Sequence, residues 1–193
     1  MRIITGILKG RKIDIPNTLD VRPTTDRTKE GLFSVIEARR YIRNTKILDL
    51  FAGSGNLGIE AISRGASSVL FVDNDRRNIR HIETLGREFE ISDRIRTAIS
   101  DVKTFLNGPQ LPYDIVFSDP PYDYPYMEEM IDTVTGDGWL YEGGWFILEH
   151  DKRHDFNDHP DCVFSKAYGR TIVSIFVNRS GTHADDADPT DER

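Results

Sequence analysis

Apolar and polar positions alternate with two different periods along most of the chain. Five short segments are rich in β-branched and aromatic residues and have the length of buried strands. They are residues 46–51, 68–73, 94–99, 113–118 and 143–150. The segments between them predict helices around residues 56–64, 75–89, 101–106 and 126–134. Because strands and helices alternate, the pattern predicts a parallel sheet with helices on both faces.

The last two apolar segments, 162–168 and 171–177, are separated only by Gly169 and Arg170. Two residues cannot carry a parallel crossover, so these strands must pair antiparallel. A mostly parallel, seven-stranded α/β sheet closed by an antiparallel C-terminal hairpin is expected of a Rossmann-like class I methyltransferase that uses S-adenosylmethionine. An NAD-binding Rossmann domain more often continues with parallel units.

The N-terminal segment has its own pattern. "RIITGILKGRKIDIP" predicts two short strands around Lys9 and Gly10, a β-hairpin closed by Pro16. A helix follows, with Thr24 or Thr25 as its N-cap. Its apolar stripe consists of Leu32, Phe33, Val35 and Ile36.

These patterns divide the chain into three parts. We expect residues 1–43 to form a hairpin and helix extension laid onto a methyltransferase domain of residues 44–180. Residues 181–193 have no strongly apolar side chains, and we expect an acidic, disordered tail there.

Composition places the chain among folded, water-soluble proteins. Hydrophobic residues make up 38% and charged residues 30% of the 193 residues. A single cysteine, Cys162, excludes an internal disulfide and a cysteine-based zinc site. The N-terminus lacks the features of a signal peptide, and no apolar run approaches the roughly 20 residues that span a bilayer. We therefore expect a cytoplasmic protein without a membrane partner, and a monomer.

Charge is distributed unevenly along the chain. The net charge is −7, yet residues 1–43 hold ten Lys/Arg and five Asp/Glu. A basic arm before an acidic body indicates a polyanionic partner, although an uneven solvated surface would look the same. The cations that we expect to contact phosphates are Lys9, Arg11, Lys12, Arg22 and Arg27.

"LDLFAGSGNLG" (48–58) places Gly53, Gly55 and Gly58 between a strand and a helix. Such a loop lets the backbone approach a ligand closely, but NAD, FAD and S-adenosylmethionine proteins all use it. Asp49 is unusual in a strand interior and needs a partner. The ammonium of a methionine moiety would supply one, and capping of neighbouring backbone amides is the alternative.

Two further acids follow the next strands. Asp73 ends the second strand, where an acid can accept both ribose hydroxyls. Asp101 follows the third strand and could bind an adenine amine, cap a helix, or do both. Asp75 is better explained as a helix N-cap than as a ligand.

"DPPY" (119–122) follows the fourth strand, at the sheet edge where ligands bind in open α/β folds. Two prolines hold Asp119 and the Pro120 carbonyl in one geometry. These two acceptors suit the two N–H groups of a planar exocyclic amine, and Tyr122 can stack on its ring. A proline-stiffened loop with an exposed acid is the structural alternative.

These motifs together resemble the bacterial 16S ribosomal RNA guanine-N2 methyltransferases of the RsmD type. The resemblance runs from Met1 to about Asn178 and includes "GILKGRKIDIP", "RPTTDRTKEGLF", "LDLFAGSGNLGIEAISRGA", "DPPY" and "YGRTIVSIF". Asp73 stands where that family suggests Glu, and Gly31 and Asn56 stand where it suggests Ala or another small residue. The acidic tail has no counterpart.

The resemblance implies S-adenosylmethionine as cofactor, S-adenosylhomocysteine as product, and 16S ribosomal RNA in an assembling small subunit as partner. It implies that residues 119–122 (Asp119, Pro120, Pro121 and Tyr122) hold the guanine, and that Arg22 to Arg27, with Thr24, reach the RNA. The cofactor positions are Asp49, Phe51, Ala52, Gly53, Ser54, Gly55, Asp73, Asn74, Asp101 and Val102.

Other functions stay open at this point. "DPPY" alone also suits an adenine-N6 DNA methyltransferase or another amine methyltransferase, and a degenerate fold could serve as an RNA-binding assembly factor. A nicotinamide oxidoreductase would need a proton donor that we do not find. His150, His154 and His159 lack metal-ligand spacing, so we predict no metal site.

Overall fold

A computed structural model describes residues 1–14, 26–39, 42–136 and 138–178, apart from the side chains of Asp26 and Arg27. The strands are β1 (Lys46–Leu50), β2 (Ser68–Asp73), β3 (Ile95–Ile99), β4 (Tyr113–Ser118), β5 (Leu140–His150), β6 (Cys162–Tyr168) and β7 (Thr171–Val177). The helices are α1 (Asp26–Arg39), α2 (Asn56–Ser63), α3 (Arg76–Glu88), α4 (Val102–Leu106) and α5 (Met127–Gly136), with a 3-10 turn at Ser92–Arg94.

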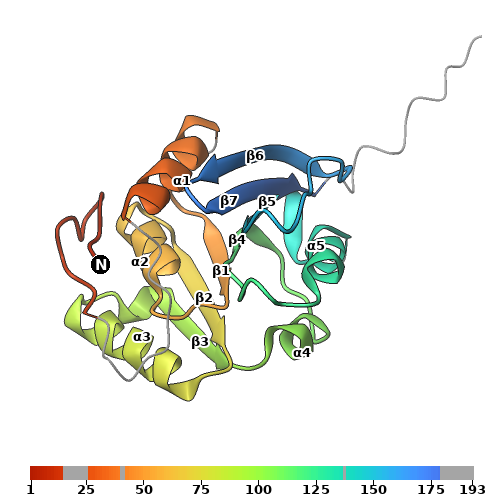
Figure 1. Cartoon of the computed structure of the whole chain (residues 1–193). Helices are drawn as coiled ribbons and strands as arrows, with labels where there is room; N and C mark the ends of the chain where they lie inside the picture. The colour runs from red at the N-terminus through yellow and green to blue at the C-terminus, as the bar shows by residue number, and fades with distance from the viewer. Residues whose placement is uncertain (15–25, 40–41, 137, 179–193) are drawn as a thin grey trace, which may run out of the picture.

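The strands form one seven-stranded sheet in the order β3-β2-β1-β4-β5-β7-β6 (Figure 1). β1 to β5 are parallel, and β7 pairs antiparallel with both β5 and β6. This is the predicted Rossmann-like methyltransferase sheet with its closing hairpin. The direction of winding reverses between β1 and β4, so the carboxyl ends of these two strands border the crevice where such folds bind ligands.

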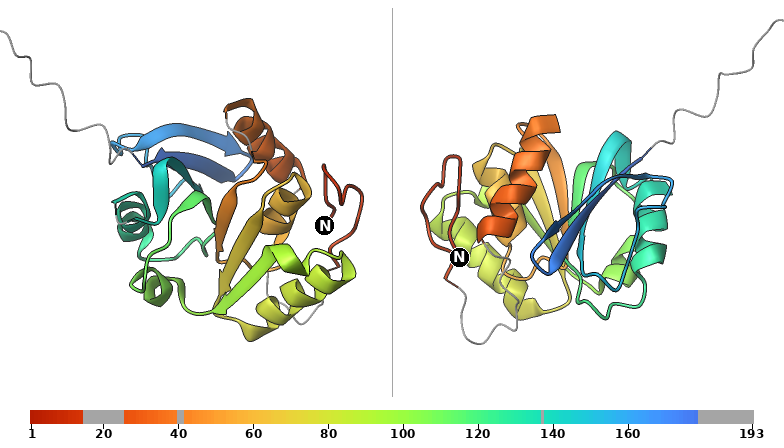
Figure 2. Two further views of the ribbon diagram at one scale, coloured as in Figure 1. Left: turned by 180° about the vertical axis from the view of Figure 1, so that it is seen from behind. Right: turned by 45° about the horizontal axis from the view of Figure 1, so that its top comes forward.

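Helices cover both faces of the sheet (Figure 2). α1, α2 and α3 pack with one set of strand residues, such as Ile47 and Phe117, around one buried cluster. α4 and α5 pack with the alternate set, such as Leu48 and Val116. The alternation follows from the two-residue period of a strand, which turns neighbouring side chains to opposite faces.

From residue 26 onward, the predicted helices and strands are present, with small shifts at their ends. Leu32, Phe33 and Ile36 of α1 are fully buried, as the apolar stripe predicted. β5 begins at Leu140 rather than at 143. None of the described helices has both the length and the apolar composition needed to cross a bilayer.

The N-terminal hairpin is present, but it lacks the two strands that we predicted. Residues 1–14 double back on themselves, and their ends pair antiparallel: Arg2 and Lys12 form a bridge, Ile3 N donates to Arg11 O, and Ile13 N donates to Met1 O. Between these ends, Ile4 N and Thr5 N donate to the Glu60 carboxylate, and Leu8 N donates to Ser63 Oγ. The segment is therefore a loop held against α2. Pro16, Thr24, Thr25 and the tail 181–193 lie outside the described residues.

Candidate active site

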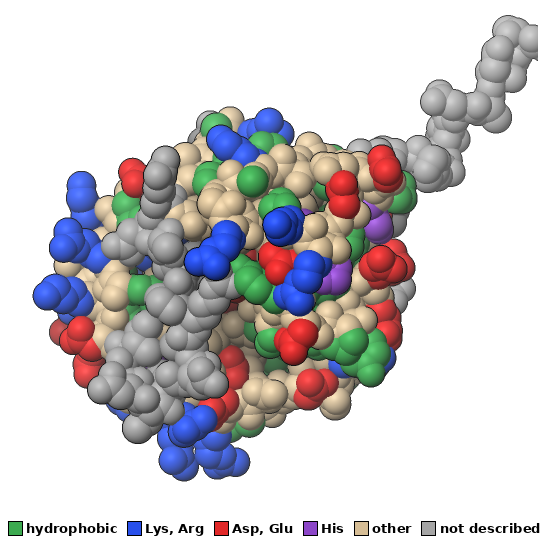
Figure 3. Space-filling model, in the orientation of Figure 1, with side chains coloured by type: hydrophobic (Ala, Val, Ile, Leu, Met, Phe, Trp, Pro, Cys, Tyr) green, Lys and Arg blue, Asp and Glu red, His purple; other side chains and the backbone are tan. Residues whose placement is uncertain are grey.

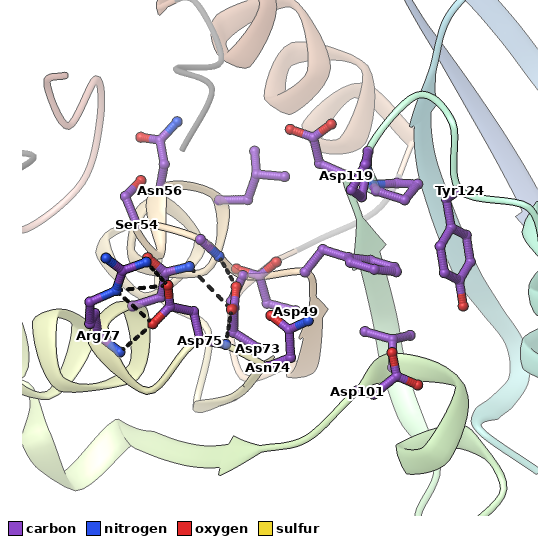
Figure 4. A pocket seen from close by; sticks show the side chains of 18 of the residues that line it. Asp49, Ser54, Asn56, Asp73, Asn74, Asp75, Arg77, Asp101, Asp119 and Tyr124 are labelled. Atoms are coloured by element: carbon purple, nitrogen blue, oxygen red, sulfur yellow. Dashed lines mark hydrogen bonds and ion pairs between the residues drawn. The ribbon is translucent and has the colours of Figure 1, made fainter. Parts of the chain in front are cut away.

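A cavity of about 700 Å³ lies at the carboxyl ends of β1, β2, β3 and β4 (Figure 4). All four residues of Asp119–Tyr122 line it, and so does every predicted cofactor position except Gly55. Gly55 stands behind the surface as the N-cap of α2, with φ of 76°. The fold therefore gathers residues from four separate loops at one place.

Several lining residues were not predicted. They are Met1, Asn56, Leu57, Asp75, Arg77, Asn78 and Tyr124. Asn56, Leu57 and Tyr124 adjoin motifs that the sequence displays, so their neighbours pointed to them. Met1 reaches the cavity only because the N-terminal loop docks on α2, and no local pattern indicates that contact.

Glycine is required at two positions of the cofactor loop for different reasons. Gly55 adopts the left-handed conformation, which most residues avoid. At Gly58, a Cβ would lie 2.3 Å from the Phe71 ring and 2.9 Å from Asp49 Oδ2. The first turn of α2 can therefore approach β1 and β2 closely only without a side chain there.

Phe51 departs from the usual rule in the same loop. Its φ of 55° is uncommon for a bulky residue. Its ring meets the ring of Tyr124 edge-on, with centroids 4.9 Å apart. Backbone strain of this kind persists where surrounding structure enforces it, often at ligand sites.

Asp49 is buried beside like charges. It is 3% exposed, and Gly58 N donates a 3.0 Å hydrogen bond to Oδ2. Burial raises the pKa of Asp49 well above its ordinary range, the Gly58 hydrogen bond opposes this, and the charges of Asp119 and Asp73 raise the pKa further. Among the described residues, Asp49 forms no ion pair. The backbone-amide alternative is therefore correct for one oxygen, and the site still favours a cation.

Asp73 is engaged by the protein itself. Its carboxylate accepts hydrogen bonds from Gly53 N (2.8 Å), Asp75 N (2.8 Å) and Asn78 Nδ2 (3.1 Å). A carboxylate offers about four acceptor directions. Counting the described residues, one direction on Oδ2 remains for a ligand, whereas the sequence suggested that Asp73 takes both hydroxyls of a ribose.

The helix-capping interpretations of Asp75 and Asp101 are confirmed. Asp75 accepts a 2.7 Å bond from Arg77 N and pairs with the Arg77 guanidinium at 2.6 Å. Asp101 accepts a 3.1 Å bond from Thr104 N at the start of α4. Both acids also line the cavity.

The two tyrosines of "DPPYDY" face different neighbours. The Tyr122 hydroxyl lies 3.3 Å from Thr171 Oγ1, and the Arg153 guanidinium lies 5.8 Å from the Tyr122 ring centroid. Tyr124 instead packs on Phe51, and Asp101 is one of the charges that add to burial in raising its pKa. The motif therefore contacts the Asp101 side of the site through Tyr124 and the start of β7 through Tyr122.

The predicted RNA-contacting cations are only partly described. Lys9, Arg11 and Lys12 are exposed on the N-terminal loop, and Figure 3 shows basic side chains at the left edge of the hollowed face as well as above the hollow. Arg11 also donates to Glu88 O at 3.1 Å and lies over the Phe89 ring. Arg22, Thr24 and the Arg27 side chain lie outside the described residues.

His150 ends β5, and His154 and His159 lie in the loop after it. His150 Nε2 lies 2.8 Å from Ser174 Oγ, and His159 Nε2 lies 3.3 Å from Asp132. Within the described ranges, no group of three or more His, Cys, Asp or Glu side chains could hold a metal ion.

Comparison with known proteins places the chain among methyltransferases. A family model described as "Conserved hypothetical protein 95" matches residues 1–177. "Putative rRNA methyltransferase YlbH" of Bacillus subtilis is 32% identical over 93% of this chain and 100% of its own length. "Ribosomal RNA small subunit methyltransferase D" of Escherichia coli (strain K12) is 36% identical over 77% of this chain and 74% of its own. A solved structure, "Putative methyltransferase yhhF from Escherichia coli", is 30% identical with a TM-score of 0.80, over 92% of this chain and 97% of that one.

Proposed function

The chain belongs to the family described as Conserved hypothetical protein 95, and from that premise we propose that it methylates the exocyclic N2 amine of a guanine in 16S ribosomal RNA. Relatives that are 34–36% identical carry the name ribosomal RNA small subunit methyltransferase D. The chain is accordingly an S-adenosylmethionine-dependent rRNA methyltransferase. The guanine target, its N2 amine and the assembling subunit as substrate are the finer parts of the proposal.

The observation that carries the proposal is one cavity lined by two chemically different groups of residues. Asp49, Asp73 and Asp101, from β1 to β3 and the loops after them, form the group that we assign to a cofactor end, and Asp119 with Pro120, after β4, form the group that we assign to a base end. The cofactor group fits a ligand that carries an ammonium, a ribose and an amino-purine. S-adenosylmethionine, when bound, supplies an electrophilic methyl group on a sulfonium.

At the cofactor end, each acid has a separate task. Asp49 would pair with the ammonium, because its burial among like charges favours a cation. Asp73 would accept one ribose hydroxyl through the direction that its three protein donors leave open. Asp101 Oδ1 caps α4, so its other oxygen would accept the adenine amine.

At the base end, the chain orients a poor nucleophile. The Asp119 carboxylate and the Pro120 carbonyl would accept the two N–H groups of the amine, which fixes its lone pair toward the methyl group. Positioning of this kind supplies much of the rate. The Asp119 charge stabilises the positive nitrogen that develops during attack. The proton leaves after attack, when the nitrogen has become acidic.

Tyr122 would stack on the target base. Its hydroxyl contact with Thr171 and the Arg153 guanidinium over its ring hold its orientation. A base in a stacked helix is out of reach, so the target lies in a loop or is flipped out. Lys9, Arg11 and Lys12, with Arg22, Thr24 and Arg27, would contact the RNA backbone. We further propose that the protein acts as a monomer in the cytoplasm.

The test compares wild type with Asp119→Ala and with the near-isosteric Asp119→Asn. We expect Asp119→Ala to lower the methylation rate by about 10²–10³-fold or more, as for removal of a transition-state contact. Its affinity for S-adenosylhomocysteine and its thermal midpoint should stay close to wild type. Near-native turnover in Asp119→Ala would exclude the assigned role.

The substrate is tested with the wild-type protein. Purified 16S ribosomal RNA, assembling small subunits, DNA and protein are offered with labelled S-adenosylmethionine, and the product is mapped by mass spectrometry. N2-methylguanine in ribosomal RNA supports the proposal. Methyladenine in DNA would favour the adenine-N6 alternative, and RNA binding without methyl transfer would favour an assembly factor.

A further inference from the structure

The β6–β7 hairpin carries a local positive charge in an acidic protein. The net charge of the chain is −7, yet residues 162–178 contain Lys166 and Arg170 and no acid. Both residues are exposed. In Figure 3, basic side chains lie above the hollow as well as at its left edge, and in the same orientation β6 and β7 lie at the top of the molecule (Figure 1). The N-terminal loop is therefore not the only source of cations beside the hollow.

Aromatic rings alternate with cations along β6. Phe164, Lys166 and Tyr168 are spaced two residues apart, so they share one face of the strand. The guanidinium of Arg39, the last residue of α1, lies 5.1 Å from the Phe164 ring centroid, and Lys166 Nζ lies 5.4 Å from that of Tyr168. Exposed cations held beside rings in this way are typical of surfaces that bind a nucleic-acid strand, because they offer phosphate contacts next to aromatic surface.

This row of side chains leads to the residue that we assign to the target base. Tyr168 pairs with Thr171 across the β6–β7 turn, and Thr171 Oγ1 lies 3.3 Å from the Tyr122 hydroxyl. Arg170 lies in that turn, directly before Thr171. Tyr122 lines the cavity. A strand of RNA that followed the row would therefore arrive at the site where the base is held.

Arg153, from the loop after β5, adds a cation beside Tyr122. Its guanidinium carbon lies 5.8 Å from the Tyr122 ring centroid, and its side chain is 56% exposed. Its backbone N and its Nε donate to the two oxygens of Asp151, at 3.0 and 2.8 Å. These two bonds fix the guanidinium. Within the described residues its two Nη atoms make no hydrogen bond, so they are available for a bidentate contact with a phosphate.

We propose that Arg39, Arg153, Lys166 and Arg170, here called the hairpin surface, bind phosphates of the RNA strand that carries the target base, with Arg153 and Arg170 nearest to that base. The inference rests on the proposed function, because it takes RNA as the substrate. Phosphate contacts of this kind fix the position of a strand without reading its sequence. Together with the N-terminal loop, the hairpin surface would hold the RNA at two places beside the cavity while the base is extruded into it.

The test measures RNA affinity at several salt concentrations, with purified 16S ribosomal RNA and with assembling small subunits. Lys166→Gln combined with Arg170→Gln removes two cations and leaves the rings in place. Each phosphate contact to a single strand contributes about 0.7 to the slope of log K against log salt, so we expect the slope to become shallower by about 1.4. At about 0.15 M salt, binding should be roughly tenfold to twentyfold weaker. Arg153→Gln should change the slope by about 0.7.

Lys46→Gln provides the matched control. Lys46 is exposed at the amino end of β1, at the opposite edge of the sheet from the cavity, so this variant should keep the wild-type affinity and slope. All variants should keep the wild-type thermal midpoint and affinity for S-adenosylhomocysteine.

Unchanged RNA binding in the hairpin variants, or an equal change in Lys46→Gln, would overturn the assignment. The proposed function is measured separately, as N2-methylguanine formed by the wild-type protein in the same RNA. If that product forms while the hairpin variants bind like wild type, only the hairpin surface is wrong. If the wild-type protein methylates neither form of the RNA, the proposed function is wrong.

Discussion

Two buried carboxylates, Glu60 of α2 and Asp49 of the neighbouring strand β1, differ in how many partners the protein gives them. Glu60, at 0% exposure, faces the N-terminal loop and α1. It accepts hydrogen bonds from Ile4 N and Thr5 N, pairs with Lys29 at 3.1 Å, and pairs with Arg64 at 2.8 Å. Every side of this carboxylate is occupied by a donor from the protein.

Asp49, at 3% exposure, lines the cavity and, within the part of the chain that the structure describes, accepts one hydrogen bond, from Gly58 N, while the charges of Asp119 and Asp73 repel it. We therefore regard Glu60 as a charge that stabilises the fold and Asp49 as a charge that can bind a ligand. Both side chains are almost completely buried, so only their hydrogen-bond and ion-pair partners distinguish them.

Removing Lys29, the cation that pairs with Glu60, should have the largest effect on stability. Lys29→Met leaves Glu60 buried with fewer donors, and breaking a buried pair of this kind costs about 3–5 kcal/mol. We expect a fall of that size in the free energy of unfolding, measured by urea denaturation.

The double variant Lys29→Met with Glu60→Leu serves as the control. It removes both charges, so it should recover part of the lost stability. If Lys29→Met unfolded at the wild-type urea concentration, the view of Glu60 as a structural charge would be wrong.

Neutralising Asp49 should have the opposite effect on stability and should weaken ligand binding. Asp49→Asn keeps an acceptor for Gly58 N and removes a charge that burial disfavours. We expect the cofactor-free protein to become more stable, and the affinity for S-adenosylhomocysteine to fall by about 1.5–3 kcal/mol, the value of a hydrogen bond to a charged group. A thermal scan and calorimetry on the same samples measure both.

The pH dependence of the Asp49 charge sharpens this test. Because its pKa is raised in the folded protein, its unfavourable contribution to stability is absent at low pH and grows as pH rises through that value. An ammonium ligand favours the ionised form, so wild-type affinity should fall as pH is lowered through the pKa of Asp49. Asp49→Asn should lose this pH dependence, and an identical slope in both proteins would contradict the assignment.

The smallest effect should come from removing an uncharged hydrogen bond between α2 and the N-terminal loop. Ser63 Oγ accepts from Leu8 N at 3.0 Å, so Ser63→Ala leaves that buried amide unbonded. We expect a loss of about 1 kcal/mol in the free energy of unfolding and no change in S-adenosylhomocysteine affinity. A clear drop in affinity would show that the docked loop and the cofactor site are coupled.

Two departures from the family pattern acquire reasons in the structure. A Cβ at Gly31 would lie 2.3 Å from Tyr168 Cε1, so the glycine in α1 matches a bulky ring on β6. Asn56 bonds the buried Lys29 and lines the cavity. Each departure depends on a partner far away in the chain, which is why inspection of the local motif gave no reason for it.

The sequence by itself determined the order of helices and strands, the antiparallel closing hairpin, and the loops that line the cavity. Those features follow from periodicity, glycine and proline, which act over a few residues. It predicted two strands in residues 1–14, which pair antiparallel only at their ends, and it could not say which buried acid has all its hydrogen-bond partners within the protein. Only the tertiary structure decided these points, because Glu60, Ser63 and Lys29 reach the N-terminal loop across 27 to 58 positions of chain. A buried polar group bonds to whichever groups the fold brings within about 3 Å of it. Those groups can be far away along the chain, so the local sequence does not identify them.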